Sequence, residues 1–210
     1  MHWCVKRVTF VELDREVVEF SRSYLSEIHR GAFDDPRVET VIDDGRAYVT
    51  GSRGRYDVVI MDMTDPVGPS KMLYTREFFA AVKGAMKDDR GLFVMHTESP
   101  VTTPRIFAAI HKTLECEFAH VTTFSLFVQM YATLWSIAVC SARTGLTAMT
   151  PGRVDRTLQR RNVEGLRIYN GATHRSMQTA FPFMADVRSL PVDIITDRRP
   201  LVSPHLHTGR

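Results

Sequence analysis

The chain has 210 residues with a formal net charge of +3, and 44% of the residues are hydrophobic, which is enough for one sizeable folded core. The basic excess is mild and no block of lysine and arginine is present, which argues against nucleic-acid-binding classes; we expect no nucleic-acid partner. No apolar run approaches the ~20 residues of a transmembrane helix and no signal peptide is visible, so we expect a cytoplasmic protein without a membrane partner. The three cysteines form neither a disulfide framework nor a metal pattern, and we expect no metal site.

Strand and helix patterns alternate along most of the chain. Six apolar runs predict strands, at residues 7–13, 38–42, 58–61, 92–96, 119–127 and 134–140. Helices are predicted between the earlier strands, with Asp14 and Thr75 as N-caps of two of them. The last two strands should form an antiparallel pair, whereas the others alternate with helices as in a parallel, doubly wound sheet. The pattern therefore predicts an α/β fold with a mostly parallel sheet.

Beyond Arg143 the pattern changes. Regular periodicity fades, arginine becomes more frequent and five prolines interrupt the chain. We therefore predict a catalytic domain over residues 1–142 and a C-terminal extension over residues 143–210. Residues 181–183 are expected to dock part of this extension, and its last ten residues are expected to be loose.

The strand at residues 58–61 ends in a loop that carries two carboxylates, Asp62 and Asp65, followed by Pro66 and Pro69. Neither proline can donate to a strand ladder, so the loop should be stiff. Ligands of open α/β sheets bind at the carboxyl ends of the strands. Two acids there suit an amine, because one can hold an ammonium while the other accepts the proton that the nitrogen must lose. A strand end at Asp62 and a turn at Asp65 explain the same spacing equally well.

Acids also follow the first two predicted strands. Glu12 ends the first strand, where an acid commonly accepts hydrogen bonds from ribose hydroxyls. Asp44, which precedes Gly45 after the second strand, is placed to reach an adenine amino group. Taken singly, Glu12 also fits a solvated strand-end acid, and Asp44 fits a helix cap. Together with Asp62 they predict one cleft at a common sheet edge.

On these residues the sequence resembles the spermidine synthase (polyamine aminopropyltransferase) family. The resemblance rests on V-E-L-D at residues 11–14, F-D-D-P-R-V at 33–38, D-G at 44–45 and D-x-x-D-P-x-G-P-x-x-x-L-Y at 62–74. It covers roughly residues 5–142, and residues 144–146 with the tail to about residue 183 resemble the family's C-terminal extension. It implies a Rossmann-like, S-adenosylmethionine-dependent methyltransferase-type fold.

The resemblance also implies an activity. An aminopropyl group would pass from decarboxylated S-adenosylmethionine to a di- or polyamine such as putrescine, with release of methylthioadenosine. The donor is then a co-substrate, no cofactor is bound permanently, and a homo-oligomer is compatible with the family. The implied site residues fall into two groups: Glu12, Asp44 and Gly45 at the nucleotide, and Asp62 (base or anchor), Asp65 (ammonium anchor) and Tyr131 at the amine.

The chain departs from the family pattern at its start. The family carries a glycine-rich nucleotide loop after its first strand, whereas the first glycine here is Gly31. We therefore expect an N-terminally truncated sheet with the first strand missing and exposed apolar strand edges. We also expect severely weakened donor binding and little or no turnover from residues 1–210 alone. Glu98 fits either a further amine contact or a solvated strand-end acid. Two alternatives stay open: a methyltransferase on the same framework, against which the two-acid loop argues, and a catalytically inactive binding or dimerisation module.

Overall fold

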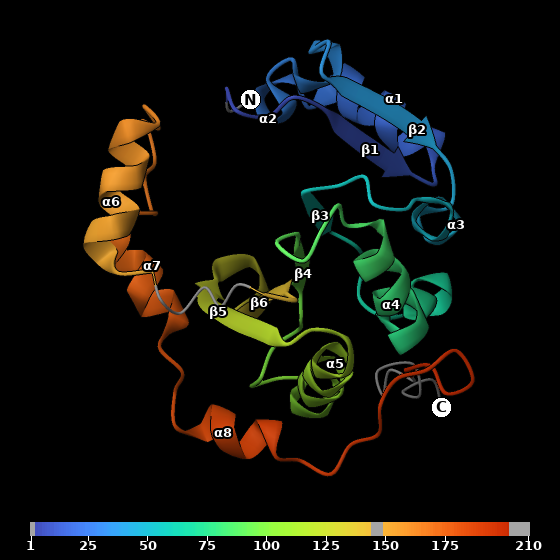
Figure 1. Cartoon of the computed structure of the whole chain (residues 1–210), viewed down its shortest axis with the longest axis vertical. Coiled ribbons are helices and arrows are strands. Elements are labelled where there is room, and N and C mark those ends of the chain that lie inside the picture. The colour runs from blue at the N-terminus through green and yellow to red at the C-terminus, as the bar shows by residue number, and fades with distance from the viewer. Residues whose placement is uncertain (1–2, 144–148, 202–210) are drawn as a thin grey trace. The chain divides into compact units, whose positions relative to one another are not determined.

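The computed structural model describes residues 3–143 and 149–201 (Figure 1). The chain divides into two compact units, unit 1 (Met1–Ser52) and unit 2 (Arg53–Arg210). The expected boundary between a catalytic domain and an extension at residue 143 stays a prediction. Residues 144–146, which carry part of the family resemblance, lie outside the described residues, as do residues 202–210.

Unit 1 contains a two-stranded parallel sheet, formed by β1 (Val8–Glu12) and β2 (Val38–Ile42). The predicted cap of its first helix is confirmed, because the Asp14 side chain accepts a hydrogen bond from the backbone N–H of Glu16. Its helices are α1 (Arg15–Tyr24), α2 (Ser26–His29), η1 (Ala32–Asp34) and α3 (Gly45–Gly51). The predicted order of strand, helix, strand and helix is therefore confirmed in this unit.

Unit 2 contains a four-stranded sheet in the order β3-β4-β6-β5, formed by β3 (Val58–Met61), β4 (Leu92–His96), β5 (His120–Val128) and β6 (Thr133–Ser141). Only β3 and β4 are parallel; β6 is antiparallel to both β4 and β5, which confirms the predicted closing pair. The expectation of one mostly parallel sheet is corrected to a parallel pair in unit 1 and a mixed sheet in unit 2. The short turn between β5 and β6 explains the mixture, because strands joined by so few residues pair antiparallel.

Strand β3 has a free edge. Among the described residues β3 pairs with β4 alone, and Ile60 on β3 is 70% exposed. A valine-rich strand of this kind is ordinarily covered on both faces. The backbone edge of β3 that lacks a neighbouring strand among the described residues, together with the exposed Ile60 side chain, agrees with the exposed apolar edge expected from the sequence. The missing first strand stays a prediction.

The remaining elements of unit 2 are η2 (Gly68–Tyr74), α4 (Arg76–Ala85), α5 (Pro104–Glu117), η3 (Gln129–Tyr131), α6 (Pro151–Arg160), α7 (Gly171–Gln178) and α8 (Phe183–Arg188). The last three helices were not predicted. Helix α6 begins with Thr150 as its cap and a proline in its first turn, but Val154 is its only buried residue. Helix α6 is amphipathic but contains few apolar residues, so the sequence shows no apolar run there.

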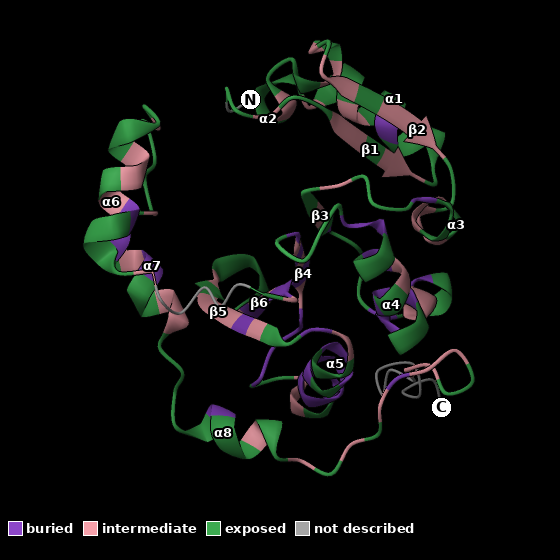
Figure 2. Ribbon diagram, viewed as in Figure 1, coloured by how far each residue is buried: buried purple, intermediate pink, exposed green. Residues whose placement is uncertain are grey.

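The core of unit 2 lies between its sheet and helices α4 and α5, where Figure 2 shows the buried residues concentrated. Its fully buried large side chains include Phe79, Phe93, Phe107, Ile110 and Leu114. Helix α7 packs on β5 and α8 packs on α5, so the described part of the extension contacts this core. The docking residue in α8 is the buried Met184, whereas Phe181 and Phe183, the expected anchors, are exposed.

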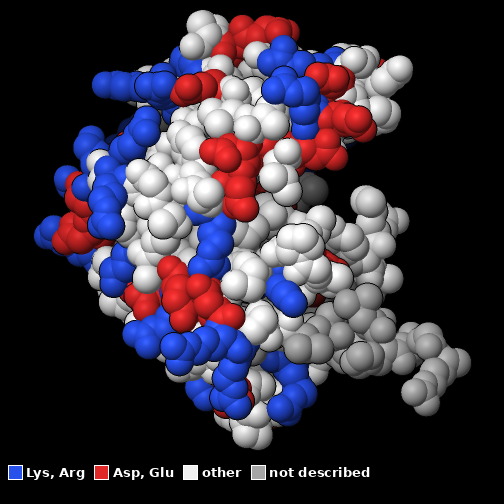
Figure 3. Space-filling model, turned by 90° about the vertical axis from the view of Figure 1, so that its right-hand side faces the viewer, with Lys and Arg blue, Asp and Glu red and all other residues white. Residues whose placement is uncertain are grey.

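The surface carries charges of both signs. On the face drawn in Figure 3, lysine and arginine are interspersed with aspartate and glutamate, and neither sign covers the face alone. Within residues 3–143 and 149–201, no helix is long and apolar enough to cross a membrane.

We expect the backbone amides of unit 1 to exchange with solvent sooner than those of unit 2. Val18 is the one fully buried apolar side chain among the described residues of unit 1, and a two-stranded sheet has little independent stability. Hydrogen exchange followed by mass spectrometry should show early labelling of β1 and β2 and late labelling of β4 and β6. Equal protection of the two sheets would contradict this expectation.

Candidate active site

The loop after β3 is held in place by its own hydrogen bonds. The Ser70 hydroxyl lies 2.7 Å from the backbone oxygen of Asp65, and Gly68 has a φ of +59°, a left-handed conformation that favours glycine. Buried Tyr74 donates its hydroxyl hydrogen to the backbone oxygen of Thr64 at 2.9 Å. These contacts position the Asp65 side chain at the carboxyl end of the unit 2 sheet.

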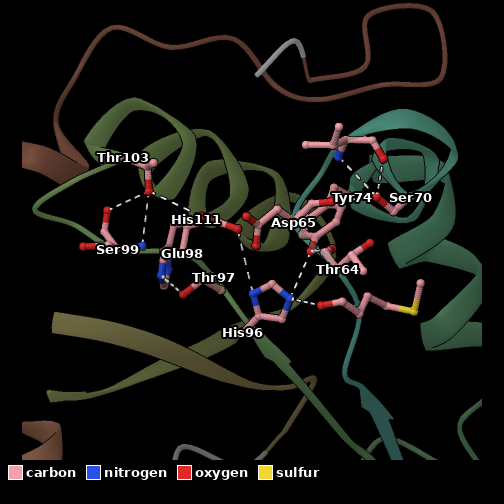
Figure 4. Close-up of polar contacts among 12 residues, drawn as sticks. Thr64, Asp65, Ser70, Tyr74, His96, Thr97, Glu98, Ser99, Thr103 and His111 are labelled. Atoms are coloured by element: carbon pink, nitrogen blue, oxygen red, sulfur yellow. Dashed lines mark hydrogen bonds and ion pairs between the residues drawn. The ribbon is translucent and has the colours of Figure 1, made fainter. Parts of the chain in front are cut away.

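His96, the last residue of β4, joins this loop to the sheet. Its Nε2 lies 2.8 Å from the backbone oxygen of Met63 and 3.1 Å from the Tyr74 hydroxyl oxygen. Because the Met63 oxygen can only accept, Nε2 carries the ring hydrogen, and in the neutral ring Nδ1 is then an acceptor. This Nδ1 lies 4.0 Å from Oε1 of Glu98 (Figure 4).

Glu98 is the buried acid of the site. It is 3% exposed and has a φ of +67°, a conformation that a glutamate seldom adopts. The Thr103 hydroxyl lies 3.5 Å from Oε2, whereas Oε1 has no hydrogen-bond partner among the described residues. Burial, then the negative charge of Asp65 and a hydrogen bond with it, raise the pKa of Glu98 to about 7.

A cavity of about 300 Å³ opens beside these acids. Its lining consists of Asp65, Pro66, Glu98, Thr102, Thr103, Ile106, Tyr131, Thr133 and Trp135. The structure therefore brings together two of the predicted residues, Asp65 and Tyr131, and adds Glu98. The Tyr131 and Trp135 rings lie 4.7 Å apart between centroids, and Trp135 stacks on His96 at 5.8 Å. Aromatic rings and carboxylates in the lining of one cavity suit a cationic ligand with an apolar body.

Asp62 lies at the end of β3, in the same loop as Asp65 but outside the cavity lining. Its carboxylate is exposed and makes no hydrogen bond or ion pair with another described residue. Burial is the main cause that raises the pKa of Tyr74 above its usual range, and the charges of Glu98, Asp65 and Asp62 add to it. Asp62 is thus close enough to Tyr74 for its negative charge to contribute to the raised pKa of the tyrosine.

The predicted nucleotide residues lie in unit 1, at the carboxyl ends of β1 and β2. Glu12 ends β1, and its Oε1 accepts a hydrogen bond from the backbone N–H of Asp14 at 3.1 Å. Asp44 follows β2 and caps α3, since its Oδ1 accepts from the backbone N–H of Arg46 at 2.7 Å; Gly45 begins that helix. The capping role of Asp44, one of its two sequence interpretations, is therefore real. One cleft shared by Glu12, Asp44 and Asp62 stays a prediction.

Two further observations concern ligands. Among the described residues, no three histidine, cysteine, aspartate or glutamate side chains are grouped as a metal site would require. A larger hollow, of about 420 Å³, lies along α6 and the turn after it. It contains none of the predicted site residues.

A family and several known proteins match this chain. Residues 1–149 match the model of the spermine/spermidine synthase domain. The chain is 34% identical to a polyamine aminopropyltransferase of Nitrosomonas europaea over 193 residues, 92% of this chain and 59% of that protein. It is 37% identical to polyamine aminopropyltransferase 2 of Hyperthermus butylicus over 205 residues, 97% of this chain and 67% of that protein.

Solved structures agree with these sequence matches. The crystal structure of spermidine synthase from Thermotoga maritima superposes with a TM-score of 0.78 at 30% identity, over 89% of this chain and 62% of that one. A spermidine synthase in complex with the transition-state analogue AdoDATO gives a TM-score of 0.80 at 30% identity and the same coverage. The chain thus spans about six tenths of the length of these structures. In sequence and in fold, the chain belongs to the spermine/spermidine synthase family.

Proposed function

We propose that the protein transfers an aminopropyl group from decarboxylated S-adenosylmethionine to a di- or polyamine such as putrescine, and releases methylthioadenosine. The observation that carries this proposal is the cavity of unit 2, whose lining combines the acids Asp65 and Glu98 with the aromatic residues Tyr131 and Trp135. The two polyamine aminopropyltransferases described above and the spermidine synthase bound to AdoDATO support it.

The acceptor side of the reaction follows from the chemistry of an amine. A primary amine is protonated near neutral pH, since a lysine-like ammonium titrates near pH ~10.4. In the proposal Asp65 holds one ammonium, Tyr131 lies along the carbon chain, and Asp62 accepts the proton of the attacking nitrogen. The exposed carboxylate of Asp62, which has no bonded partner among the described residues, is suited to that exchange.

The bond changes are simple. The amine nitrogen forms a bond to the propyl carbon attached to the sulfonium, the carbon–sulfur bond breaks, and its electron pair goes to sulfur. The sulfonium becomes the neutral thioether of methylthioadenosine, and the nitrogen gives its proton to the base. Because the leaving group is already activated, the protein mainly aligns the reactants and removes a proton.

The donor side of the proposal uses unit 1. Glu12 would accept hydrogen bonds from the ribose hydroxyls, and Asp44 with Gly45 would contact the adenine. Glu12 and Asp44 lie at the carboxyl edge of the same parallel sheet, which supports this assignment.

The experiment that tests the function incubates the chain with decarboxylated S-adenosylmethionine and putrescine, at high protein concentration because turnover is expected to be slow. Mass spectrometry should find spermidine and methylthioadenosine in equal amounts. A methylated amine formed from S-adenosylmethionine would instead establish the methyltransferase alternative. Binding of both ligands without any product would favour the inactive module.

Replacing Glu12 by glutamine is expected to weaken nucleotide binding about 10- to 100-fold, the usual effect of losing a charged hydrogen-bond acceptor. Calorimetry with methylthioadenosine measures this directly. The control is Glu16→Gln, the same change at an exposed position in the first turn of α1. Equal affinities of the two variants would remove Glu12 from the nucleotide site.

A further inference from the structure

Two buried polar atoms beside the cavity, one on Glu98 and one on His96, have no hydrogen-bond partner among the described residues. Figure 4 shows the carboxylates of Asp65 and Glu98 directed toward one another, with His96 on the other side of Glu98. Oε1 of Glu98 and Nδ1 of His96 are both buried, lie 4.0 Å apart, and have no hydrogen-bond partner among the described residues. Each of these two atoms therefore lacks the hydrogen-bond partner that buried polar atoms ordinarily have.

We propose that Glu98 and Asp65 share a proton in the empty site, and that an ammonium group of the amine acceptor displaces this proton when it binds. The inference rests on the proposed function and assigns Glu98 to that same site as a second ammonium ligand. The cation would then supply the N–H donors that the two carboxylates lack, and the released proton would go to solvent.

Electrostatics supports the shared proton. Ionising both of two adjacent carboxylates costs considerable free energy when one of them is buried, because their negative charges repel each other outside water. One proton therefore stays with the pair. The pKa of Glu98, raised to about 7 by its burial and by Asp65, agrees with this. An ammonium bound between the Asp65 and Glu98 carboxylates favours loss of the shared proton, because a positive charge at short range stabilises the ionised form of both acids.

The backbone supports a dedicated role for Glu98. A left-handed φ at a non-glycine residue costs free energy and persists mainly where the surrounding structure requires it, often at functional sites. Here it accompanies a side chain whose carboxylate lines the cavity instead of reaching solvent. A solvated strand-end acid, the other sequence interpretation of Glu98, is excluded by its burial.

The other titratable groups near Glu98 come from four elements. These are Tyr74 on η2, His96 on β4, Tyr131 on η3 and His111 on α5, the last of which contacts Thr97 at 3.3 Å. Burial raises the pKa of Tyr74 above its usual range and lowers the pKa of His111 to about 3, so neither group titrates near neutrality. Among the groups near the cavity whose pKa is shifted, Glu98 beside Asp65 is the one left near neutrality, and the Glu98→Gln variant described below separates its proton from any on His96.

The sign of the pH dependence follows from these assignments. The amine stays protonated up to pH ~10 and contributes no change near neutrality. The empty site holds its extra proton below about pH 7 and has lost it above that pH, and amine binding requires the ionised pair. Affinity should therefore fall about tenfold for each unit of pH below the pKa of the pair, and be nearly constant above it.

The first measurement is made on the unaltered chain. Calorimetric titration with 1,4-diaminobutane, in two buffers of different ionisation enthalpy, counts the protons released on binding. Close to one proton should be released per amine at about pH 6 and almost none at about pH 8.5. Binding without proton release at about pH 6, or no binding at either pH, would overturn the proposal.

The second measurement uses Glu98→Gln, which retains a hydrogen bond to Asp65 but cannot ionise. Its affinity for 1,4-diaminobutane should be independent of pH and weaker than that of the unaltered chain at both about pH 6 and about pH 8, with the larger difference, more than about tenfold, at about pH 8. The control is Glu164→Gln, the same change at an exposed residue of the extension, which should retain the original pH profile. A Glu98→Gln profile with the original slope would show that Glu98 does not carry the proton.

These binding experiments need neither donor nor turnover, so they separate the two proposals. Proton release on amine binding without spermidine formation would contradict only the proposed function. Spermidine formation with pH-independent amine binding would contradict only the shared proton.

Discussion

Replacing Asp62 by asparagine is expected to lower the rate of aminopropyl transfer by about 10²- to 10⁴-fold, the usual effect of removing a general base. Asparagine keeps the shape of the side chain but can neither accept the proton nor offset the charge of an ammonium. Nucleotide binding should change little, because the proposed nucleotide ligands, Glu12 and Asp44, lie in unit 1. Single-turnover formation of spermidine, with donor and amine varied separately, measures the effect.

The matched control is Asp57→Asn, an exposed carboxylate next to the opposite end of β3, which pairs with Lys87 at 4.0 Å. It makes the same chemical change and should leave the rate within a few-fold of the original. Asp65→Asn should act mainly on the apparent KM for the amine, because Asp65 is proposed as an anchor. If Asp62→Asn retained turnover like Asp57→Asn, this loop would not be the catalytic element.

Replacing Phe93 by alanine is expected to lower the free energy of unfolding of unit 2 by about 3–5 kcal/mol. Phe93 is fully buried on β4, and its ring lies 5.8 Å from those of both Phe79 and Phe118, so its removal leaves a cavity that these neighbours cannot easily fill. Urea unfolding followed by far-UV circular dichroism measures the change. A loss of that size is a large fraction of the stability of an ordinary domain.

The control for this prediction is Phe127→Ala. Phe127 lies on β5 of the same sheet but is 65% exposed, so replacing its ring by a methyl group removes little buried apolar surface. Its effect should stay within about 0.5 kcal/mol. A similar loss of stability in both variants would mean that the core does not lie between the sheet and helices α4 and α5.

The elements that were predicted correctly are those whose pattern is local. The run from Val58 to Met61, the caps Asp14 and Thr75 and the hairpin of β5 and β6 all follow from a few neighbouring residues. Helices α6, α7 and α8 were missed because each buries only one or two residues and α8 is only six residues long, so none has the long apolar run by which the earlier elements are recognised.

The site divides in the same way. From the sequence alone, Glu12, Asp44 and Asp62 could be placed at strand ends, because an acid at the end of an apolar run is recognised from neighbouring residues. Tyr131 came only from the family resemblance, and the structure places it in the lining of the same cavity as Asp65. Only the tertiary structure could decide that Glu98 is buried against Asp65 and faces His96, because burial and a left-handed φ depend on how η2, α5 and β6 pack around β4. The sequence by itself determined which residues carry charge and where strands end. Packing decided which of the acids is buried, and burial is the largest cause of the raised pKa by which Glu98 holds a proton.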